Sequence, residues 1–154
     1  MTNTPLATLL QAECALLEAF ITVLQREQHL LIEGRTEDLE AVAREKSRIA
    51  DQLTGAGQQR EAALSSLGLD AGREGISIWQ ARADATEQAR WSSLLESAAE
   101  ARRLNETNGR LITERLQRNQ QLLQVLTAAS NRAALYGPDG QTQVSTGGRT
   151  LGSA

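Results

Sequence analysis

The chain has 154 residues, a net charge of -3, an apolar fraction of 40% and an aromatic fraction of only 3%. This length suits one domain with a real core, and the prevalence of Leu and Ala is typical of long helices. The acidic balance argues against nucleic acid and anionic lipid as partners. Cys14 is the only cysteine, and no leader or bilayer-spanning pattern is evident, so we expect a soluble cytoplasmic all-α protein without stable membrane insertion.

The first predicted helix runs from Pro5 to about Ile32. Thr4 can cap it, and Pro5 suits the first helical position. Gly34 is expected to end it, because glycine readily adopts the positive φ that follows a last helical turn. The apolar residues recur mostly at three, four and seven positions, which predicts one buried stripe. Its members are Leu6, Leu9, Leu10, Leu16, Leu17, Phe20, Leu24 and Leu31.

The second predicted helix has Thr36 as its cap and runs to about Leu67. Alternating steps of three and four define a heptad seam with two cationic interruptions. This seam passes Gly55 and Gly57 without a change of phase, so we predict one weakened or kinked helix rather than two. The seam comprises Leu39, Val42, Lys46, Ile49, Leu53, Ala56, Arg60, Ala63 and Leu67.

Residues 68–75 are expected to form a glycine-rich loop, and residues 76–82 a short helical turn around Trp79. The third long helix starts near Asp84, which forms a capping box with Glu87, and runs to about Asn131. Its seam reads Trp91, Leu94, Ala98, Ala101, Asn105, Asn108, Ile112, Arg115, Asn119, Leu122 and Leu126. The sequence therefore predicts an all-α antiparallel bundle of about three long helices over residues 1–131. The Gly-rich residues 132–154 are interpreted as a flexible tail.

The unequal helix lengths indicate where a partner could bind. At 1.5 Å per residue the third helix should measure roughly 70 Å, against roughly 40 Å and 48 Å for the first two. It should therefore pass the tip of the helix hairpin near Arg115. Beyond that point we expect an apolar stripe without an intramolecular partner, and such a stripe normally marks a protein contact. It contains Leu116, Leu122, Leu123, Val125 and Leu126.

Two alternatives to a partner-binding overhang stay open. The third helix can bend at Gly109 and fold back, or a homodimer can cover the stripe. The polar seam residues also have a structural explanation, because a buried Asn commonly fixes the register of a helix bundle. These residues are Asn105, Asn108, Arg115 and Asn119.

The sequence offers little catalytic chemistry. His29 is the only histidine, and Glu33 four residues later brings the count to two ligands, so we expect neither a metal site nor a cofactor. Cys14 lies within the first helix without a neighbouring cation in the sequence, which favours an inert thiol. Arginines along the third helix alternate with glutamates, which favours a solvated face over nucleic-acid binding. We therefore predict that the chain is not an enzyme.

Three segments carry a family resemblance. Residues 104–112 read LNETNGRLI, residues 119–121 read NQQ and residues 135–142 read LYGPDGQT. In this order and spacing they resemble the carboxy-terminal half of the FlgN family of flagellar type III export chaperones. The preceding helices resemble the family in layout only, including the segment Glu45-Lys46-Ser47. Gly55 and Gly57 are not a feature of the family and leave the continuity of the second helix open.

The resemblance implies a flagellar export chaperone that binds and protects the hook-filament junction proteins FlgK and FlgL through their carboxy-terminal helices. It would deliver them to the export gate protein FlhA. Family knowledge places cargo binding in the carboxy-terminal part, in agreement with the predicted overhang. The candidate cargo-binding residues are Leu111, Ile112, Arg115, Leu116, Asn119, Leu122, Leu123 and Leu126. The resemblance further implies docking to FlhA through the tail segment of Tyr136, Gly137, Asp139 and Gly140.

An alternative function belongs to a different class. A structural coiled-coil protein could use the same overhang to pair with its own copy, with no cargo and an inert tail. The two hypotheses differ in what a polar substitution within the stripe should abolish, either cargo binding or self-association.

Overall fold

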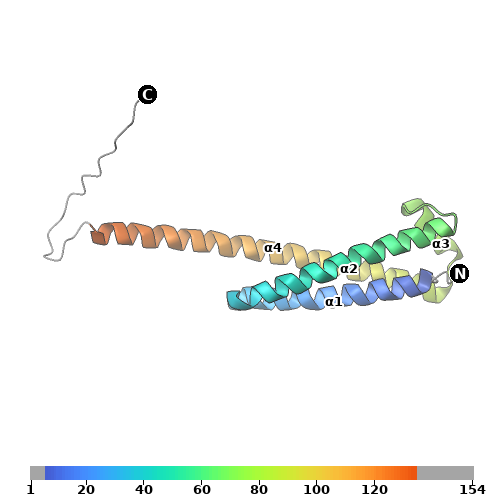
Figure 1. Ribbon diagram of the computed structural model, residues 1–154, viewed down its shortest axis with the longest axis horizontal. Helices are drawn as coiled ribbons and strands as arrows, with labels where there is room; N and C mark the ends of the chain where they lie inside the picture. The colour runs from blue at the N-terminus through green and yellow to red at the C-terminus, as the bar shows by residue number, and fades with distance from the viewer. Residues whose placement is uncertain (1–5, 135–154) are drawn as a thin grey trace, which may run out of the picture. The chain divides into compact units, whose positions relative to one another are not determined.

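The computed structural model describes residues 6–134, with side chains described up to Asn131, and within this range every regular element is a helix. The long helices α1 (Leu6–Glu33) and α2 (Leu39–Ser66) are joined by the short 3-10 helix η1 (Thr36–Asp38). A short helix α3 (Arg73–Arg82) and the long helix α4 (Ala85–Ala134) follow. Figure 1 shows α1 and α2 side by side and antiparallel, as a hairpin. The predicted all-α class is confirmed.

The chain divides into two compact units, Met1–Ile112 and Thr113–Ala154. The first unit contains α1, α2, α3 and the part of α4 up to Ile112. The part of α4 from Thr113 to Ala134 belongs to the second unit. Because all the buried apolar residues lie in the first unit, it contains the hydrophobic core of the described chain.

Two glycines end the hairpin helices in the same way. Gly34 and Gly68 both have φ of 75°, a conformation that costs glycine little. After Gly34, the Arg35 amide donates a hydrogen bond to the carbonyl of Leu30 at 3.0 Å, and after Gly68, Leu69 donates to Leu64 at 3.0 Å. This is the Schellman arrangement, which satisfies carbonyls at a helix end. Gly34 was predicted to end the first helix and Gly68 to begin the loop after the second, and both predictions are confirmed.

The start of α4 is a reciprocal capping box. The Glu87 amide donates to Oδ1 of Asp84 at 2.8 Å, and the Asp84 amide donates to Oε2 of Glu87 at 3.1 Å. The side chains thereby satisfy backbone donors that the first turn leaves without partners. This prediction is confirmed, whereas the predicted cap of the first helix at Thr4 and Pro5 lies outside the described residues.

Two local predictions were wrong. Thr36 does not cap α2, because residues 36–38 form η1 and α2 starts at Leu39 without a side-chain cap. An ion pair of 2.6 Å between Arg35 and Asp38 spans η1 instead. Gly75 was assigned to a loop, but it is the third residue of α3 and is buried. A Cβ at Gly75 would lie 1.6 Å from the carbonyl oxygen of Asp70, so the preceding loop packs directly on the helix backbone.

Helix α2 is unbroken through Gly55 and Gly57, but its buried face differs from the predicted heptad seam at the end. Leu64 is fully buried, while Leu67, the predicted seam residue, is 51% exposed. A straight helix has 3.6 residues per turn and drifts by about 20° per heptad against a strict seven-residue repeat. Towards the end of the seam this drift moves the buried position one residue later, from the predicted Ala63 to the observed Leu64.

The buried face of α4 also departs from the predicted seam. Leu104 is 3% exposed, whereas the predicted seam residue Asn105 is exposed. Both positions are compatible with steps of three and four from Ala101. The apolar side chain takes the buried position because burying Leu is favourable, whereas burying an amide requires hydrogen-bond partners.

Two charged layers cross the hairpin. Glu13 and Glu27 are buried on α1, two heptads apart, and the cations that interrupt the α2 seam are also two heptads apart. Nε of Arg60 donates to Oε2 of Glu13 at 2.8 Å, and Nζ of Lys46 donates to Oε1 of Glu27 at 3.1 Å. The cationic interruptions in the sequence therefore have buried carboxylate partners, and these pairs set the register of α1 against α2.

Helix α4 supplies a third group to each charged layer. The guanidinium of Arg60 lies 5.7 Å from the ring centroid of Trp91, within the range of a cation–π interaction. Nδ2 of Asn108 donates to Oε1 of Glu27 at 2.9 Å and to the carbonyl of Leu24 at 2.8 Å. Asn108 is fully buried, so the idea that a polar seam residue fixes the bundle register has a physical basis here.

Candidate functional site

The candidate binding surface is a group of exposed apolar side chains on α4, all in the second unit. Single exposed leucines are common on protein surfaces, but a group on one helical segment indicates a contact site. We call the following five residues the apolar stripe. Their exposed fractions are 57% for Leu116, 57% for Leu122, 63% for Leu123, 64% for Val125 and 56% for Leu126.

The remaining predicted cargo-binding residues lie at the start of the stripe or beside it. Leu111 and Arg115 are half-buried, Ile112 is 38% exposed and Asn119 is exposed. Val125 was part of the predicted overhang but not of the candidate cargo-binding set, although it is as exposed as its neighbours. Helix α4 runs through Gly109 without a break, and every member of the stripe is exposed.

The predicted docking segment in the tail lies outside the described residues. This applies to Tyr136, Gly137, Asp139 and Gly140. Helix α4 is described to Ala134, three residues beyond the predicted end of the helical domain at residue 131.

The apolar stripe continues the helical face that is buried earlier in α4. Leu122 follows the buried Asn108 by two heptads, and Leu126 lies one helical turn after Leu122, whereas Val125 has drifted by about 60° from the side of the buried Leu104, three heptads earlier. Residues a whole number of heptads apart lie on nearly the same side of a helix. The face that packs against the hairpin in the first unit therefore reappears, exposed, in the second unit.

The distal part of this helix is free of charge. Arg118 is the last charged residue before Arg132, so residues 119–131 contain no Asp, Glu, Lys or Arg. Earlier in the helix, charges alternate in sign, and Arg103 donates two hydrogen bonds to Glu100 at 2.8 Å and 2.7 Å. These hydrogen bonds lower the pKa of Glu100. The predicted mixed-charge face is thus present in the earlier part of the helix and ends at Arg118. We call the members of the apolar stripe beyond this point, Leu122, Leu123, Val125 and Leu126, the distal stripe.

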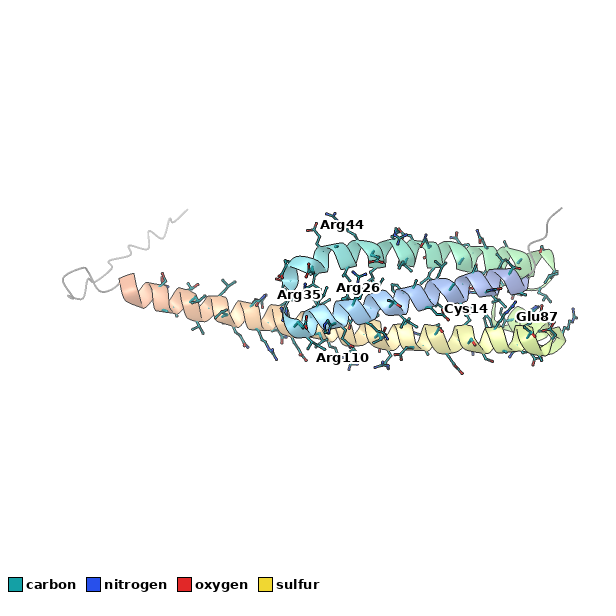
Figure 2. The ribbon with its side chains drawn as sticks, turned by 90° about the horizontal axis from the view of Figure 1, so that it is seen from below. Cys14, Arg26, Arg35, Arg44, Glu87 and Arg110 are labelled. Atoms are coloured by element: carbon teal, nitrogen blue, oxygen red, sulfur yellow. The ribbon has the colours of Figure 1, made fainter. Side chains whose placement is uncertain are left out.

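A surface groove of about 530 Å³ lies between α1 and α2 near η1. Arg26 pairs with Glu45 at 2.8 Å and Arg35 with Asp38 at 2.6 Å, so its two arginines already have carboxylate partners. Figure 2 shows Arg26 between the ribbons of the hairpin. The groove therefore offers an ionic ligand little uncompensated charge. It is lined by Thr22, Gln25, Arg26, His29, Leu30, Arg35, Asp38, Ala41 and Val42.

The side chains considered for chemistry are engaged structurally. Nε2 of His29 lies 3.1 Å from Glu33, and both are exposed. No group of three His, Cys, Asp or Glu residues in the described part of the chain is arranged to hold a metal ion. Burial, followed by the nearby carboxylates of Glu13 and Glu18, raises the pKa of Cys14. Its thiol lies on the α4 side of α1, 3.7 Å from the carbonyl of Arg90, and stays protonated at neutral pH (Figure 2).

Helix α1 is apolar enough over an 18-residue window to meet the length and composition criteria for a membrane span. The same criteria are met by core helices of soluble proteins. Nine of its residues are buried in the described structure, including both carboxylates of the charged layers.

The fold and the candidate surface define the class: an all-helical bundle protein, in which a helix hairpin packs with a long helix whose last part carries the exposed apolar stripe. The sequence comparisons identify the family. The family model described as FlgN protein matches residues 1–143, and the chain belongs to the FlgN family.

Curated relatives match over nearly the whole chain. A protein of Yersinia enterocolitica, named flagella synthesis protein FlgN, is 33% identical over 150 residues, which cover 96% of both chains. A protein of the same name from Salmonella typhimurium is 34% identical over 151 residues, which cover 96% of this chain and 98% of the relative. No solved structure gives a significant match.

Proposed function

We propose that this chain is a cytoplasmic flagellar export chaperone that binds and protects the hook-filament junction proteins FlgK and FlgL and delivers them to the export gate protein FlhA. Membership of the FlgN family supports a role in flagellar synthesis. The single observation that favours protein binding as the activity is the exposed apolar stripe of α4. A contact of this kind requires no cofactor and no catalytic group.

The stripe suits the masking of an amphipathic helix. A cargo segment that assembles through coiled-coil contacts exposes apolar side chains before assembly, and the leucines of the stripe can pack as knobs between them. Fully burying one leucine side chain contributes about 1.5–3 kcal/mol, but ordering two partners subtracts a large part of the total. Binding through a few leucines would therefore be strong enough to prevent premature assembly and weak enough to permit release without ATP hydrolysis.

Replacing Leu122 and Leu126 by Asp should abolish cargo binding while leaving the bundle folded. Both side chains are more than half exposed, so the charges remain hydrated in the free protein and become costly only when a partner covers them. We expect affinity for FlgK to fall at least about a hundredfold, the equivalent of about 2.7 kcal/mol. Isothermal titration calorimetry measures the affinity, and far-UV circular dichroism measures the helix content.

Leu95 supplies a matched control. It lies on the same helix in the first unit, is 51% exposed and is outside the apolar stripe, so Leu95→Asp should leave FlgK binding intact. Unchanged binding by the double variant would contradict the proposed surface. If light scattering instead shows that the double variant loses a homo-oligomeric state and the original chain binds no cargo, the self-assembling coiled-coil function is the correct one.

We further propose that Tyr136 docks the chaperone on FlhA, which rests on family resemblance alone. Tyr136→Ala should weaken binding to the isolated cytoplasmic part of FlhA at least about tenfold, while FlgK binding stays unchanged. Tyr136→Phe separates the two parts of the side chain, because it keeps ring packing and removes the hydroxyl. Pull-down titrations of both partners give the readout, and equal FlhA binding by Tyr136→Ala would exclude this role.

A further inference from the structure

The occupant of the apolar stripe can be described by the face on which the stripe lies. In the first unit this face of α4 packs against helices, with Trp91, Leu94, Ala101 and Leu104 in the common core. Leu122 continues the same face two heptads after the buried Asn108, and Leu126 follows Leu122 by one helical turn. Knobs spaced in this way fit the holes of another helix. We therefore expect the partner at the apolar stripe to pack as the helices of the first unit pack on α4, so the expected occupant is a helix.

In the first unit, this face of α4 lies next to two buried charged groups, Glu27 and Arg60, and both have partners. Glu27, at the α1 interface, receives hydrogen bonds from both Lys46 and Asn108. Arg60 has Glu13 as its partner and the ring of Trp91 beside it. A buried charge is tolerated under such conditions, because an ion pair and further hydrogen bonds offset part of the lost hydration.

The distal part of the stripe offers a partner's charge no such compensation. Between residues 119 and 131 the helix has only apolar, amide and hydroxyl side chains. A carboxylate or ammonium group of a partner, pressed onto Leu122, Leu123 or Leu126, would lose water and gain no counter-charge. This desolvation penalty is comparable with the whole contribution of the leucines.

We infer that the distal stripe selects a helix whose contact face is itself free of charge and made of apolar and amide side chains. This inference deepens the proposed function, since it takes the stripe as the cargo-binding surface. The selection works by exclusion: a helix with a charged residue at the interface is rejected by uncompensated desolvation rather than by a clash. Charge therefore does not guide the distal contact, and recognition there depends on the shape and hydrogen bonding of uncharged groups.

A charge placed on the stripe face tests this inference. Asn119 lies three, four and seven residues before Leu122, Leu123 and Leu126, on the same side of the helix. Asn119→Asp and Asn119→Lys should both weaken FlgK binding at least about tenfold, because an uncharged partner face offers neither sign a complementary charge. Isothermal titration calorimetry with intact FlgK measures both effects.

Gln124 provides the matched control. It lies two positions from both Leu122 and Leu126, about 200° around the helix axis, so Gln124→Asp and Gln124→Lys should leave the Kd within about twofold. If one charge at Asn119 weakens binding and the opposite charge strengthens it, the partner face is charged and the inference is wrong, while the proposed function stands. If neither charge has an effect, the inference is also wrong. If the original chain does not bind FlgK but dimerises, and the Asn119 variants are monomeric, the occupant is a second copy.

Discussion

Replacing Glu27 by Ala should lower the free energy of unfolding by about 2–3 kcal/mol, a large fraction of the stability of a small domain. Glu27 is 5% exposed and accepts hydrogen bonds from Nζ of Lys46 at 3.1 Å and from Nδ2 of Asn108 at 2.9 Å. Its removal leaves an ammonium group and an amide donor without this partner inside the bundle. The expected loss lies below the upper range for broken buried pairs, because the Lys46 side chain is 25% exposed and can reach water.

A neighbouring ion pair makes this prediction quantitative. Arg26 and Glu45 precede Glu27 and Lys46 by one residue on each helix and are paired at 2.8 Å, but their side chains are 56% and 37% exposed. Glu45→Ala should therefore cost less than about 1 kcal/mol. Urea unfolding followed by far-UV circular dichroism measures both variants. Equal losses for the two variants would show that burial of the Glu27 layer contributes nothing beyond an ordinary surface pair.

Gly75→Ala should destabilise the fold by about 2–3 kcal/mol, although Ala is the better helix former by about 1 kcal/mol. The new methyl group would lie 1.6 Å from the carbonyl oxygen and 2.6 Å from the carbonyl carbon of Asp70. These are backbone atoms, so α3 and the loop must separate. Trp79 on α3 packs edge-on against Trp91 with ring centroids 6.3 Å apart, and this contact would loosen.

Tryptophan fluorescence reports this separation. Trp79 and Trp91 are both buried, so the emission of Gly75→Ala should shift to longer wavelength and its urea midpoint should fall. Gly72→Ala is the control, because a Cβ there would meet Oδ2 of Asp70 at 3.6 Å, which is ordinary contact with a side chain. Its stability should change by less than about 0.5 kcal/mol. An equally small effect at Gly75 would contradict the close packing of the Asp70 loop.

The parts of the fold that depend on local chemistry were predictable. Gly34 and Gly68 end their helices, and the Asp84–Glu87 box starts α4, because each involves residues within one turn of each other. Gly75 could not be predicted, since the need for glycine comes from the backbone of Asp70 folding onto α3. The sequence shows three glycines between residues 68 and 75, but it does not show which of them is required by packing and which only permit a turn.

The charged layers were only half predictable. Lys46 and Arg60 stood out as cations in an apolar seam, but their partners Glu13 and Glu27 were not identified. The sequence could have identified them, because these glutamates have the same two-heptad spacing as the cations and fall among the periodic apolar residues of the first helix. Asn108 was predicted as a polar residue of the α4 seam, but its hydrogen bond to Glu27 could not be deduced, since it joins residues 81 positions apart in the sequence.

For the candidate surface, the exposed leucines followed from helix length and periodicity. The uncharged run from residue 119 to residue 131 was also visible in the sequence, but only the exposure of Leu122, Leu123 and Leu126 gives it a consequence for binding. The importance of Asn119 as a test position follows from the same combination of helix geometry and charge distribution.

The two charged layers also prevent the hairpin from slipping lengthwise. The Glu13–Arg60 and Glu27–Lys46 pairs define a register in which Phe20 and Leu53 fall opposite each other, midway between the layers, and both side chains pack against the core. A shift of one heptad would keep every helix intact. It would, however, place Arg60 against Phe20 and Glu27 against Leu53, so that both charged groups would be buried without an ion-pair partner. Because this error is costly, the charged layers favour the one register in which both carboxylates meet their cations, and that register gives α4 a correctly aligned surface to pack against.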